Sequence, residues 1–434
     1  MSTKGKKKKI LFLIHTLQIG GAEKVLVNLV NNMDKDKFDI TVMTVINTGA
    51  FRKELDDDIK YKTIFNIKIL NKNKSGSGNL YSNGSKIKKI LGKMYQFVWR
   101  HANCKKIYNK YIKEKFDVEV AFLEGIPAKI IASSSNEKSK KISWIHVDLI
   151  NEKKTENFFK NREEEVDTYN KFDKIVCVSK LVKNQFENKM KITPDKVIVE
   201  YNPIDVEHIE KLSQEENQDI SKEKFTMIAV GRLSKQKGFD RLLKIVKRLN
   251  EEKFEFDLWI IGVGAEEDKL KEYIKNNNLN NVKMLGYKKN PYKYIKEADL
   301  LVCSSRAEGF STVVSEAVIL EKVIVTTDCS GMKEILGEEN EYGIVCNNSE
   351  DDLFSSLKKI LSDEKQYEYY LNKVKERKGI FNLEESVERI EKIIGEQEWK
   401  KKKWLKFYYM YTFFFIFFLW LIENLNHLDL IYVL

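Results

Sequence analysis

The chain has 434 residues, 42% of them hydrophobic and 32% charged, and a formal net charge of +11. This length exceeds one ordinary core and suits two domains of about 200 residues each, and the composition excludes a disordered chain. The five cysteines form no C-x-x-C pair, which disfavours a disulfide framework or a zinc knuckle and favours a reducing compartment. The charge fits a Lys- and Asn-rich surface or attraction to anionic lipid. Nucleic acid is not an expected partner, because no nucleic-acid-binding motif accompanies the charge.

The first half alternates strand-like and helix-like segments. Its N-terminal apolar run is too short for a signal peptide and lacks a cleavage site, so it predicts the first strand. A helical pattern over 22–30 then separates two apolar or β-branched runs, which indicates a βαβ unit. The predicted strands of this half are 10–14, 40–45, 118–122, 142–145, 175–178 and 197–200.

The polar, acidic stretch 200–224 predicts an interdomain linker, and the alternation resumes after it. The predicted strands of the second half are 225–230, 258–261, 282–285, 300–303 and 323–326. The fold class is therefore α/β, with two Rossmann-like, doubly wound parallel-sheet domains that face each other across a cleft. The expected division is an N-terminal domain over 1–205, a C-terminal domain over 206–380, a helix over 381–399 that could return to the N-terminal domain, and a tail over 400–434.

Two segments raise the question of a membrane. After a flexible loop at 76–79, the stretch 86–100 predicts a basic amphipathic helix, which would either lie on a membrane or pack as a surface helix on the first sheet. The sequence leaves both possibilities open. The tail is apolar and aromatic from Trp404 to Ile422 and follows a lysine cluster. It predicts an anchor that spans or lies on the membrane with the domains on the cytoplasmic side; the alternative is a buried core helix.

Two candidate binding sites follow predicted strands, the place where α/β folds bind ligands. Gly20 and Gly21 allow close backbone approach, and the helix after them offers free amide groups to an anion. Arg232 and Lys237 follow a strand that ends at Gly231, and their charges suit a diphosphate. Taken singly, the first site also fits an ordinary turn and the second a surface salt bridge.

The third candidate site is the stretch "EGFSTVVSE". Residues 309–312 would form a loop and a first helical turn, with Ser311 or Thr312 as the N-cap and the amides directed at a phosphate. Glu308 precedes this helix and Glu316 lies about one turn inside it. The two carboxylates would therefore address different parts of one ligand, as a sugar nucleotide requires.

This stretch resembles the E-x7-E signature of the retaining GT-B glycosyltransferases of family four. Further matches run through residues 8 to 395 and include "GGAEKV", "WIHVD", "CVSK", "YNPID", "VGRLSKQKGFDRLL", "IIGVG", "LGY" and "EADLLVCSSRAEGF". The chain departs from the family pattern at Ser311, where glycine is usual, and at Glu321 and Val323, where glycine and proline are frequent.

The resemblance implies transfer with retention and without a metal or other cofactor, by front-face attack of the acceptor hydroxyl while the diphosphate accepts its proton. Arg232 and Lys237 would then bind the donor diphosphate, Glu308 the donor-sugar hydroxyls and Glu316 the ribose, with His146 near the transferred sugar. The implied catalytic residues are Glu308, His146, Arg232 and Lys237. The implied substrate-binding residues are Gly20, Gly21, Arg232, Lys237, Tyr287 near the nucleobase, Glu308, Gly309, Phe310, Ser311, Thr312 and Glu316.

Other polar residues have simpler interpretations. The acidic pairs that could mimic a metal-binding D-x-D motif, Asp34 with Asp36 and the run 56–58, are expected to lie in solvated turns. His15 and His101 are expected to be structural or exposed.

The expected function is a cytoplasmic, membrane-associated retaining glycosyltransferase. It would move a sugar from a nucleotide-diphosphate donor, expected to be UDP-linked, to a lipid-linked saccharide or glycolipid at the inner face of the cytoplasmic membrane, for surface polysaccharide synthesis. A GT-B sugar-nucleotide epimerase and a non-catalytic membrane-bound scaffold are the alternatives. An NAD-dependent oxidoreductase is disfavoured, because the first strand is not followed by G-x-G-x-x-G.

Overall fold

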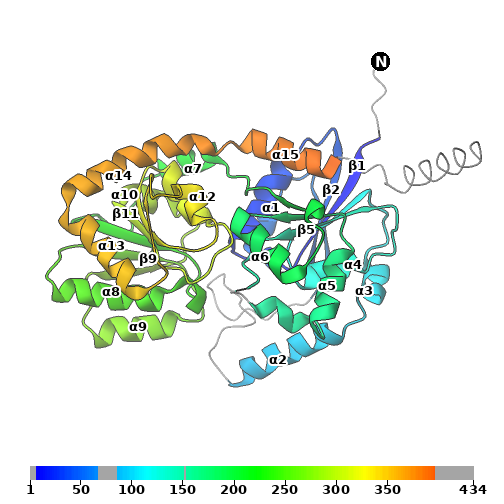
Figure 1. Ribbon diagram of the computed structural model, residues 1–434, viewed down its shortest axis with the longest axis horizontal. Helices are drawn as coiled ribbons and strands as arrows, with labels where there is room; N and C mark the ends of the chain where they lie inside the picture. Colours follow the sequence, from blue (N-terminus) through cyan, green and yellow to red (C-terminus); the bar gives the residue numbers. More distant parts are fainter. Residues whose placement is uncertain (1–5, 67–85, 151–152, 396–434) are drawn as a thin grey trace, which may run out of the picture. The chain divides into compact units, whose positions relative to one another are not determined.

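The computed structural model describes residues 6–66, 86–150 and 153–395 (Figure 1). The predicted loop at 76–79 and the predicted anchor at 400–434 lie outside these ranges. Within the ranges, no helix combines the length and the apolar character that crossing a bilayer requires. All elements but the last turn of the final described helix belong to one compact unit, Met1–Glu391.

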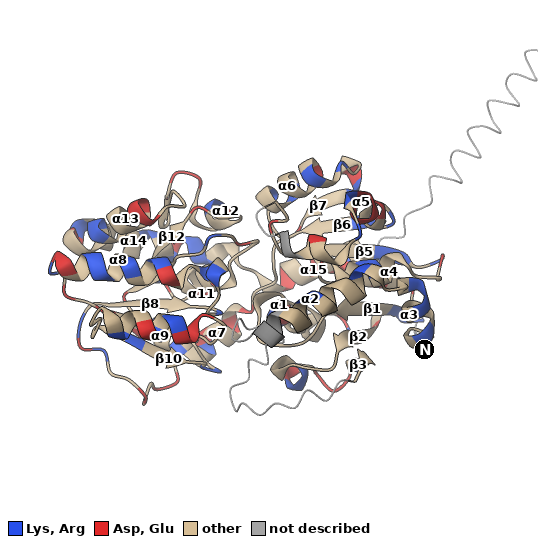
Figure 2. Ribbon diagram, turned by 90° about the horizontal axis from the view of Figure 1, so that it is seen from below, with Lys and Arg blue, Asp and Glu red and all other residues tan. Residues whose placement is uncertain are grey.

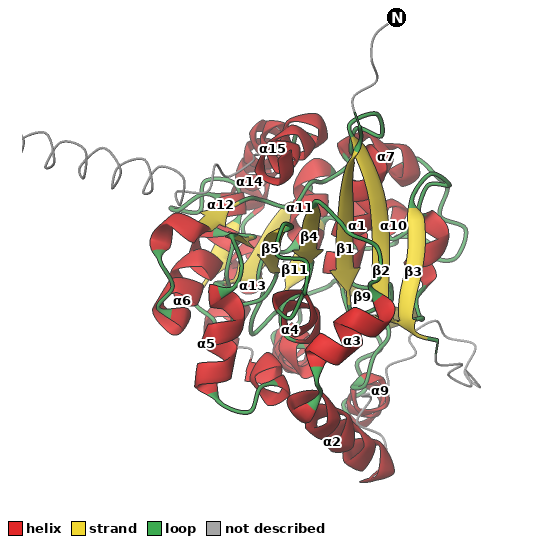
Figure 3. Ribbon diagram, turned by 90° about the vertical axis from the view of Figure 1, so that its right-hand side faces the viewer, coloured by secondary structure: helices red, strands yellow, loops and turns green. Residues whose placement is uncertain are grey.

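The first half forms a seven-stranded parallel sheet in the order β3-β2-β1-β4-β5-β6-β7. Its strands are β1 (Lys8–Ile14), β2 (Phe38–Ile46), β3 (Lys60–Phe65), β4 (Val118–Ala121), β5 (Lys140–Ile145), β6 (Lys174–Cys177) and β7 (Val197–Val199). Figure 3 shows β1, β2 and β3 side by side. In the register of the first pair, Ile10 of β1 is the partner of Ile40 of β2. Residues 10–14 are fully buried, because helices cover both faces of the sheet.

The helices of this half connect the parallel strands. They are α1 (Gly21–Asn32), α2 (Lys86–His101), α3 (Cys104–Tyr111), α4 (Ile126–Ala132), α5 (Arg162–Asn170) and α6 (Lys180–Met190), with 3-10 helices at Ala50–Glu54, Lys153–Phe158 and Pro194–Lys196. The six predicted strands and the helix predicted over 22–30 are confirmed. Strand β3 was not expected, because this edge strand exposes polar side chains and lacks a continuous apolar run.

The second half forms a six-stranded sheet in the order β10-β9-β8-β11-β12-β13. Its strands are β8 (Thr226–Val230), β9 (Asp257–Ile261), β10 (Val282–Gly286), β11 (Leu300–Cys303), β12 (Val323–Thr327) and β13 (Ile344–Cys346). All five pairings are parallel, as predicted. Strand β13 was not expected, since its three residues are too few to show a periodic pattern.

The first helix of the second half lies within the stretch that the sequence predicted as a linker. The helices of this half are α7 (Val206–Ser213), α8 (Phe239–Glu251), α9 (Glu267–Asn276), α10 (Tyr292–Glu297), α11 (Thr312–Ile319), α12 (Met332–Leu336), α13 (Glu350–Ser362), α14 (Glu364–Arg377) and α15 (Leu383–Gly395), with 3-10 helices at Lys235–Lys237 and Lys378–Ile380. The expectation of a simple linker over 200–224 is wrong for α7, which packs on α10 and α11. The Asp205 side chain caps this helix by accepting from the His208 amide, and Ile209 is buried.

The strand orders locate the sites. In each sheet the order reverses beside the first strand of that half, between β1 and β4 and between β8 and β11. Ligands of doubly wound sheets bind at the carboxyl ends of strands at such a reversal. Three of the predicted site segments follow β1, β8 and β11, and His146 follows β5 directly.

Candidate functional site

The turn after β1 brings two predicted sites together. Helix α1 begins at Gly21, and its N-cap Gly20 provides no side chain to satisfy the first amides. A methyl group on Gly20 would lie 3.1 Å from Arg232 Nη2, and one on Gly21 would lie 3.5 Å from Thr312 Oγ1. Arg232 also donates a hydrogen bond of 3.3 Å to the Ile19 carbonyl oxygen. The glycine turn therefore lies against both Arg232, the cation predicted to bind the diphosphate, and the start of α11.

The same turn holds a carboxylate that sequence reasoning missed. A methyl group on Gly20 would lie 2.2 Å from Oε2 of Glu23, which is half-buried in the first turn of α1. Burial raises the pKa of Glu23, and the nearby Arg232 guanidinium partly offsets that effect. The sequence signal that could have identified Glu23 is its position in "GGAEKV", next to the predicted glycine turn.

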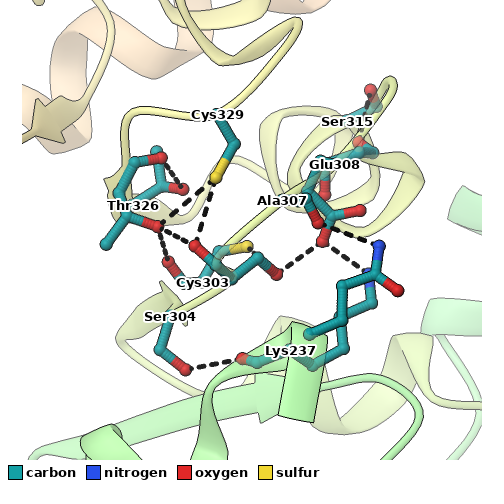
Figure 4. A network of polar contacts seen from close by, with 12 residues as sticks. Lys237, Cys303, Ser304, Ala307, Glu308, Ser315, Thr326 and Cys329 are labelled. Carbon is teal, nitrogen blue, oxygen red and sulfur yellow. Dashed lines mark hydrogen bonds and ion pairs between the residues drawn. The ribbon is translucent and has the colours of Figure 1, made fainter. Parts of the chain in front are cut away.

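Lys237 and Glu308 form an ion pair (Figure 4). The Lys237 Nζ lies 2.6 Å from Glu308 Oε1, and the Ser305 hydroxyl donates to the same oxygen. Burial opposes the charge on Lys237, but the Glu308 carboxylate outweighs it, so the pKa of the ammonium is raised. The pair places a cationic and an anionic side chain at adjacent positions of the site.

A buried arginine supports the loop that carries Glu308. Arg241 Nε donates to the Ser304 carbonyl oxygen over 2.8 Å, and its Nη2 donates to the Ser305 carbonyl oxygen over 2.5 Å. Arg306, beside them, forms two hydrogen bonds of 2.7 and 2.8 Å with the Asp240 carboxylate. Sequence reasoning missed Arg241, although an arginine among the apolar positions of an amphipathic helix was a visible signal.

The start of α11 offers unpaired donors. Ser311 occupies the N-cap position, one of the two predicted. Its side chain does not cap the helix, which corrects the expected role: the hydroxyl is buried and has no hydrogen-bond partner among the described residues. The first amides of α11 and this hydroxyl are therefore available to an anion.

Gly309 and His146 touch through their backbones. A methyl group on Gly309 would lie 1.9 Å from the His146 carbonyl oxygen, so only glycine fits at this contact. Phe310, the next residue, packs against Tyr201 with ring centroids 5.5 Å apart and ring planes tilted by 39°. The loop before α11 is thereby fixed against the residue that follows β5.

His146 is buried and neutral. Burial lowers the pKa of its imidazole to about 3, and its Nε2 atom has no hydrogen-bond partner within the described part of the chain. Its backbone amide donates to Glu124 Oε2 over 3.1 Å. An orphan buried ring nitrogen can pair with a ligand hydroxyl without adding charge.

Glu316 is engaged by two residues that sequence reasoning missed. Lys24 Nζ lies 2.7 Å from Glu316 Oε1 and also donates to the Tyr292 hydroxyl. Burial opposes the Lys24 charge, but Glu316 outweighs it and raises the pKa of the ammonium. Burial, together with the Glu316 carboxylate, raises the pKa of Tyr292 to about 12. Lys24 belongs to the "GGAEKV" motif, which was the available signal.

The remaining candidates lie apart from these contacts. Tyr287 follows β10 with 39% of its surface exposed, and none of the contacts described above includes it. Asp34 accepts from the Asp36 amide over 2.8 Å and lies 2.9 Å from Lys37 Nζ, so this acidic pair forms the predicted turn. Residues 56–58 are exposed. No cluster of three or more metal-ligating side chains occurs in the described ranges.

His15 and His101 match the expectation that they are structural or exposed. His15 is structural: its Nε2 lies 2.6 Å from the Tyr95 hydroxyl, and burial lowers the pKa of its ring to about 4. His101 is exposed at the end of α2. All five cysteines are buried and unpaired, which agrees with the absence of a disulfide framework.

Two family models match the chain. Residues 19–208 match "Glycosyltransferase Family 4", and residues 210–377 match "Glycosyl transferases group 1". Together the matches include the glycine turn, both cations, His146 and both glutamates of the E-x7-E stretch.

Named relatives carry transferase descriptions. The N-acetylgalactosamine-N,N'-diacetylbacillosaminyl-diphospho-undecaprenol 4-alpha-N-acetylgalactosaminyltransferase of Campylobacter jejuni is 36% identical over 218 residues, which are 49% of this chain and 58% of that protein. An uncharacterized glycosyltransferase of Haemophilus influenzae is 25% identical over 392 residues, 88% of this chain and 98% of that protein. The matched regions span 58%, 40% and 60% of the first three curated relatives.

Solved structures share the fold. Anabaena HepE in complex with UDP and glucose superposes with a TM-score of 0.66 at 20% identity, over 90% of this chain and 100% of that one. WaaG, a glycosyltransferase involved in lipopolysaccharide biosynthesis, superposes with a TM-score of 0.62 at 13% identity, over 89% and 100%. These similarities show the GT-B arrangement of two Rossmann-like domains predicted for the chain.

Proposed function

Because the chain belongs to the glycosyltransferases of group 1 and family 4, we propose that it transfers a sugar, with retention of anomeric configuration, from a nucleotide-diphosphate donor to a lipid-linked saccharide or glycolipid. One observation carries the proposal most directly. The glycine turn after β1 lies against Arg232 and Thr312, so a phosphate-sized anion there would meet a guanidinium and the free amides of two helices.

The donor diphosphate is assigned to the positive groups of this site. Arg232 and Lys237 would bind its oxygens and offset the charge that develops on the leaving group, and the amides at the start of α11 would add to this. These groups supply the electrostatic stabilisation that a metal provides in other transferases, so the proposed mechanism uses no metal and no cofactor. UDP is the proposed nucleotide, and the UDP-bound structure of HepE supports this choice.

The sugar and the ribose are assigned to the two glutamates. Glu308, held in place by Lys237 and Ser305, would accept hydrogen bonds from donor-sugar hydroxyls, and the orphan Nε2 of His146 would pair with another hydroxyl. Glu316 would hold the ribose hydroxyls, and Tyr287 would lie near the base. Gly309, Phe310, Ser311 and Thr312 complete the proposed binding loop.

The reaction itself would be a front-face substitution at the anomeric carbon. The acceptor hydroxyl oxygen bonds to this carbon as the bond to the diphosphate oxygen breaks, and the leaving diphosphate takes the hydroxyl proton. The neutral imidazole of His146 suits a hydrogen-bonding role, because an imidazole whose pKa is about 3 is unprotonated at neutral pH.

The names of the relatives support a proposal for the acceptor and for the place of the reaction. The Campylobacter relative is named for an undecaprenol-linked acceptor, and WaaG for lipopolysaccharide biosynthesis. We assign the acceptor to the same chemical class and place the reaction at the inner face of the cytoplasmic membrane, with residues 400–434 as a membrane anchor. In this proposal, the domain over 1–205 binds the acceptor and the domain over 206–380 binds the donor. The helix over 381–399 returns to the N-terminal domain, and nucleic acid is not a partner.

The test is thermal stabilisation of the full chain by UDP, GDP, ADP or NAD without metal. A ligand at a hundred times its dissociation constant stabilises by about 2.7 kcal/mol, a shift of a few degrees. UDP is expected to stabilise the native protein and Lys235→Ala, an exposed control in the same loop, but not Arg232→Ala. Stabilisation by NAD alone would contradict the donor assignment.

Incubation with donor alone and with donor plus a lipid-linked acceptor separates the alternatives. Transfer to the acceptor with the donor's anomeric configuration, read by NMR, supports the proposal. Conversion of the donor to an epimer without acceptor would identify an epimerase. Binding of no nucleotide would favour the scaffold.

A further inference from the structure

A single charged residue interrupts the apolar helix α11. Every residue from Val313 to Ile319 is buried, and Glu316 is the only charged one among them. Its Oε1 atom lies 2.7 Å from Nζ of Lys24, in α1. Its Oε2 atom accepts no hydrogen bond from a residue in the described ranges, and it is not fully enclosed. One oxygen of the carboxylate is therefore held, and the other is available to a ligand.

The Lys24 ammonium joins two residues of the second half. Besides pairing with Glu316, it donates to the hydroxyl of Tyr292, which begins α10 and is only 3% exposed. Glu23 and Lys24 are the only charged residues of α1, so the rest of its ribbon is tan in Figure 2. A cation near a helix N-terminus is unfavourable for the helix itself. The contact with α11, and not the stability of α1, therefore accounts for a lysine at this position.

The first turn of α1 meets the second half in two contacts of opposite charge. The Glu23 carboxylate lies near the Arg232 guanidinium, and Lys24 pairs with Glu316. Arg232 and Glu316 are the residues assigned to the donor diphosphate and to the donor ribose. A buried ion pair is often no more stabilising than apolar side chains of similar volume, so stability alone does not explain the pair. A carboxylate that must accept from a hydroxyl in one orientation gains from a fixed partner on its other oxygen.

We propose that Lys24 is a positioning residue for the donor ribose. Its ammonium holds Glu316 Oε1, so that Oε2 stays in place to accept a hydrogen bond from a ribose hydroxyl. The Tyr292 hydroxyl fixes the same ammonium and thereby limits its movement. The inference rests on the proposed function, which assigns the ribose to Glu316. It adds that recognition of the donor depends on a residue of the first half that makes no contact with the nucleotide.

The experiment compares two nucleotides that differ only at the ribose. UDP and dideoxy-UDP, which lacks both ribose hydroxyls, are titrated calorimetrically into the full chain and into its Lys24→Met and Lys24→Arg variants, below the melting temperature of each. Lys24→Gln takes the place of Lys24→Met if the methionine variant does not fold. The matched control is Lys378→Met, which removes an ammonium that pairs with Glu210 outside the proposed donor site. The Lys378 side chain is 33% exposed and the Lys24 side chain 25%.

The native chain is expected to bind UDP more tightly than dideoxy-UDP. Lys24→Met should weaken UDP binding about tenfold and leave dideoxy-UDP binding unchanged, because a displaced carboxylate affects only the ribose hydroxyls. Lys24→Arg should restore part of the discrimination, and Lys378→Met should retain all of it. Glu316→Gln should weaken UDP binding by itself, and adding Lys24→Met to it should cause no further loss, since both residues act through one contact.

Three results would overturn the proposal, and they differ in what they say of the proposed function. Equal weakening of both nucleotides by Lys24→Met would assign Lys24 a direct contact with the diphosphate or the base. Unchanged discrimination in that variant would leave the pair with Glu316 a structural role only. Both results would keep the donor assignment intact. A native chain that binds neither nucleotide would contradict the proposed function itself, and the role of Lys24 with it.

Discussion

The carboxyl ends of the two sheets contribute different chemistry to the site. The second half supplies charges in fixed pairs, with Lys237 on Glu308 and Arg306 on Asp240. The first half supplies glycines with free amides, the Lys24 ammonium that pairs with Glu316, and His146, a neutral ring with an orphan nitrogen. In the proposed assignment, the cations that bind the donor diphosphate and the neutral ring that meets the sugar come from different halves. Substitutions in the two halves should therefore damage separate steps.

The largest effect is expected where the halves touch. Gly309→Ala would place a methyl group 1.9 Å from the His146 carbonyl oxygen, and a backbone atom cannot move aside cheaply. We expect destabilisation of about 3 kcal/mol, or separation of the two segments with loss of nearly all transfer activity. Thermal unfolding and activity assays measure both. The control Gly379→Ala, which meets nothing within 4 Å, should change neither. Equal behaviour of the two variants would show that this contact is dispensable.

The ion pair of the second half is tested by Lys237→Met. The substitution leaves the Glu308 carboxylate buried without its ion-pair partner, which should cost about 2 to 3 kcal/mol and abolish UDP stabilisation. Adding Glu308→Gln should restore most of the stability but not the binding.

The native pair of Lys237 and Glu308 also predicts a dependence of stability on pH. Because the folded pKa of Lys237 is raised above 10.5, its contribution is full below that value and is lost as pH rises through the folded pKa. Full UDP binding by Lys237→Met would contradict the donor assignment.

His146, the neutral ring of the first half, is tested by pH. Burial lowers the pKa of His146 from 6.5 to about 3, so the unfolded chain binds its proton more readily than the native protein does. The associated stability is therefore complete above pH 6.5 and is lost as pH falls toward 3, by about 2 kcal/mol at pH 5. Denaturant unfolding from pH 7 to 5 should show this loss, and His146→Gln should reduce it. The same variant should lower kcat and leave UDP affinity unchanged. Weaker UDP binding with unchanged kcat would assign His146 to the donor site.

The smallest effect is expected at the acidic turn before β2. Asp34→Asn with Asp36→Asn keeps side-chain acceptors for the turn amides and removes the exposed ion pair of Asp34 with Lys37, which contributes little because solvent screens it. Transfer activity should be unchanged with and without manganese. A large loss that manganese restores would replace the proposed charge-based stabilisation with a metal.

Much of the fold was determined by local pattern. Strands buried on both faces, such as β1, appear as continuous apolar runs, and the spacing of Glu308 and Glu316 around a helix start is a local property. Strand β3 and helix α7 were not predicted. The strand is stabilised by edge pairing and the helix by packing on α10 and α11, and a short stretch of sequence contains neither contact. The cap predicted for Ser311 failed for the same reason: its surroundings, not its residue type, direct the hydroxyl.

The sequence by itself determined the alternation of strands and helices, the two sheets, and the order of charged and glycine-rich turns along the chain, because these depend on neighbours within a few residues. Only the tertiary structure decided that Lys24 pairs with Glu316, that Gly309 touches His146, and that Arg241 supports the Glu308 loop. It also decided which face of α2 is covered. Each of these depends on segments far apart in sequence, whose approach is set by packing of the complete sheets.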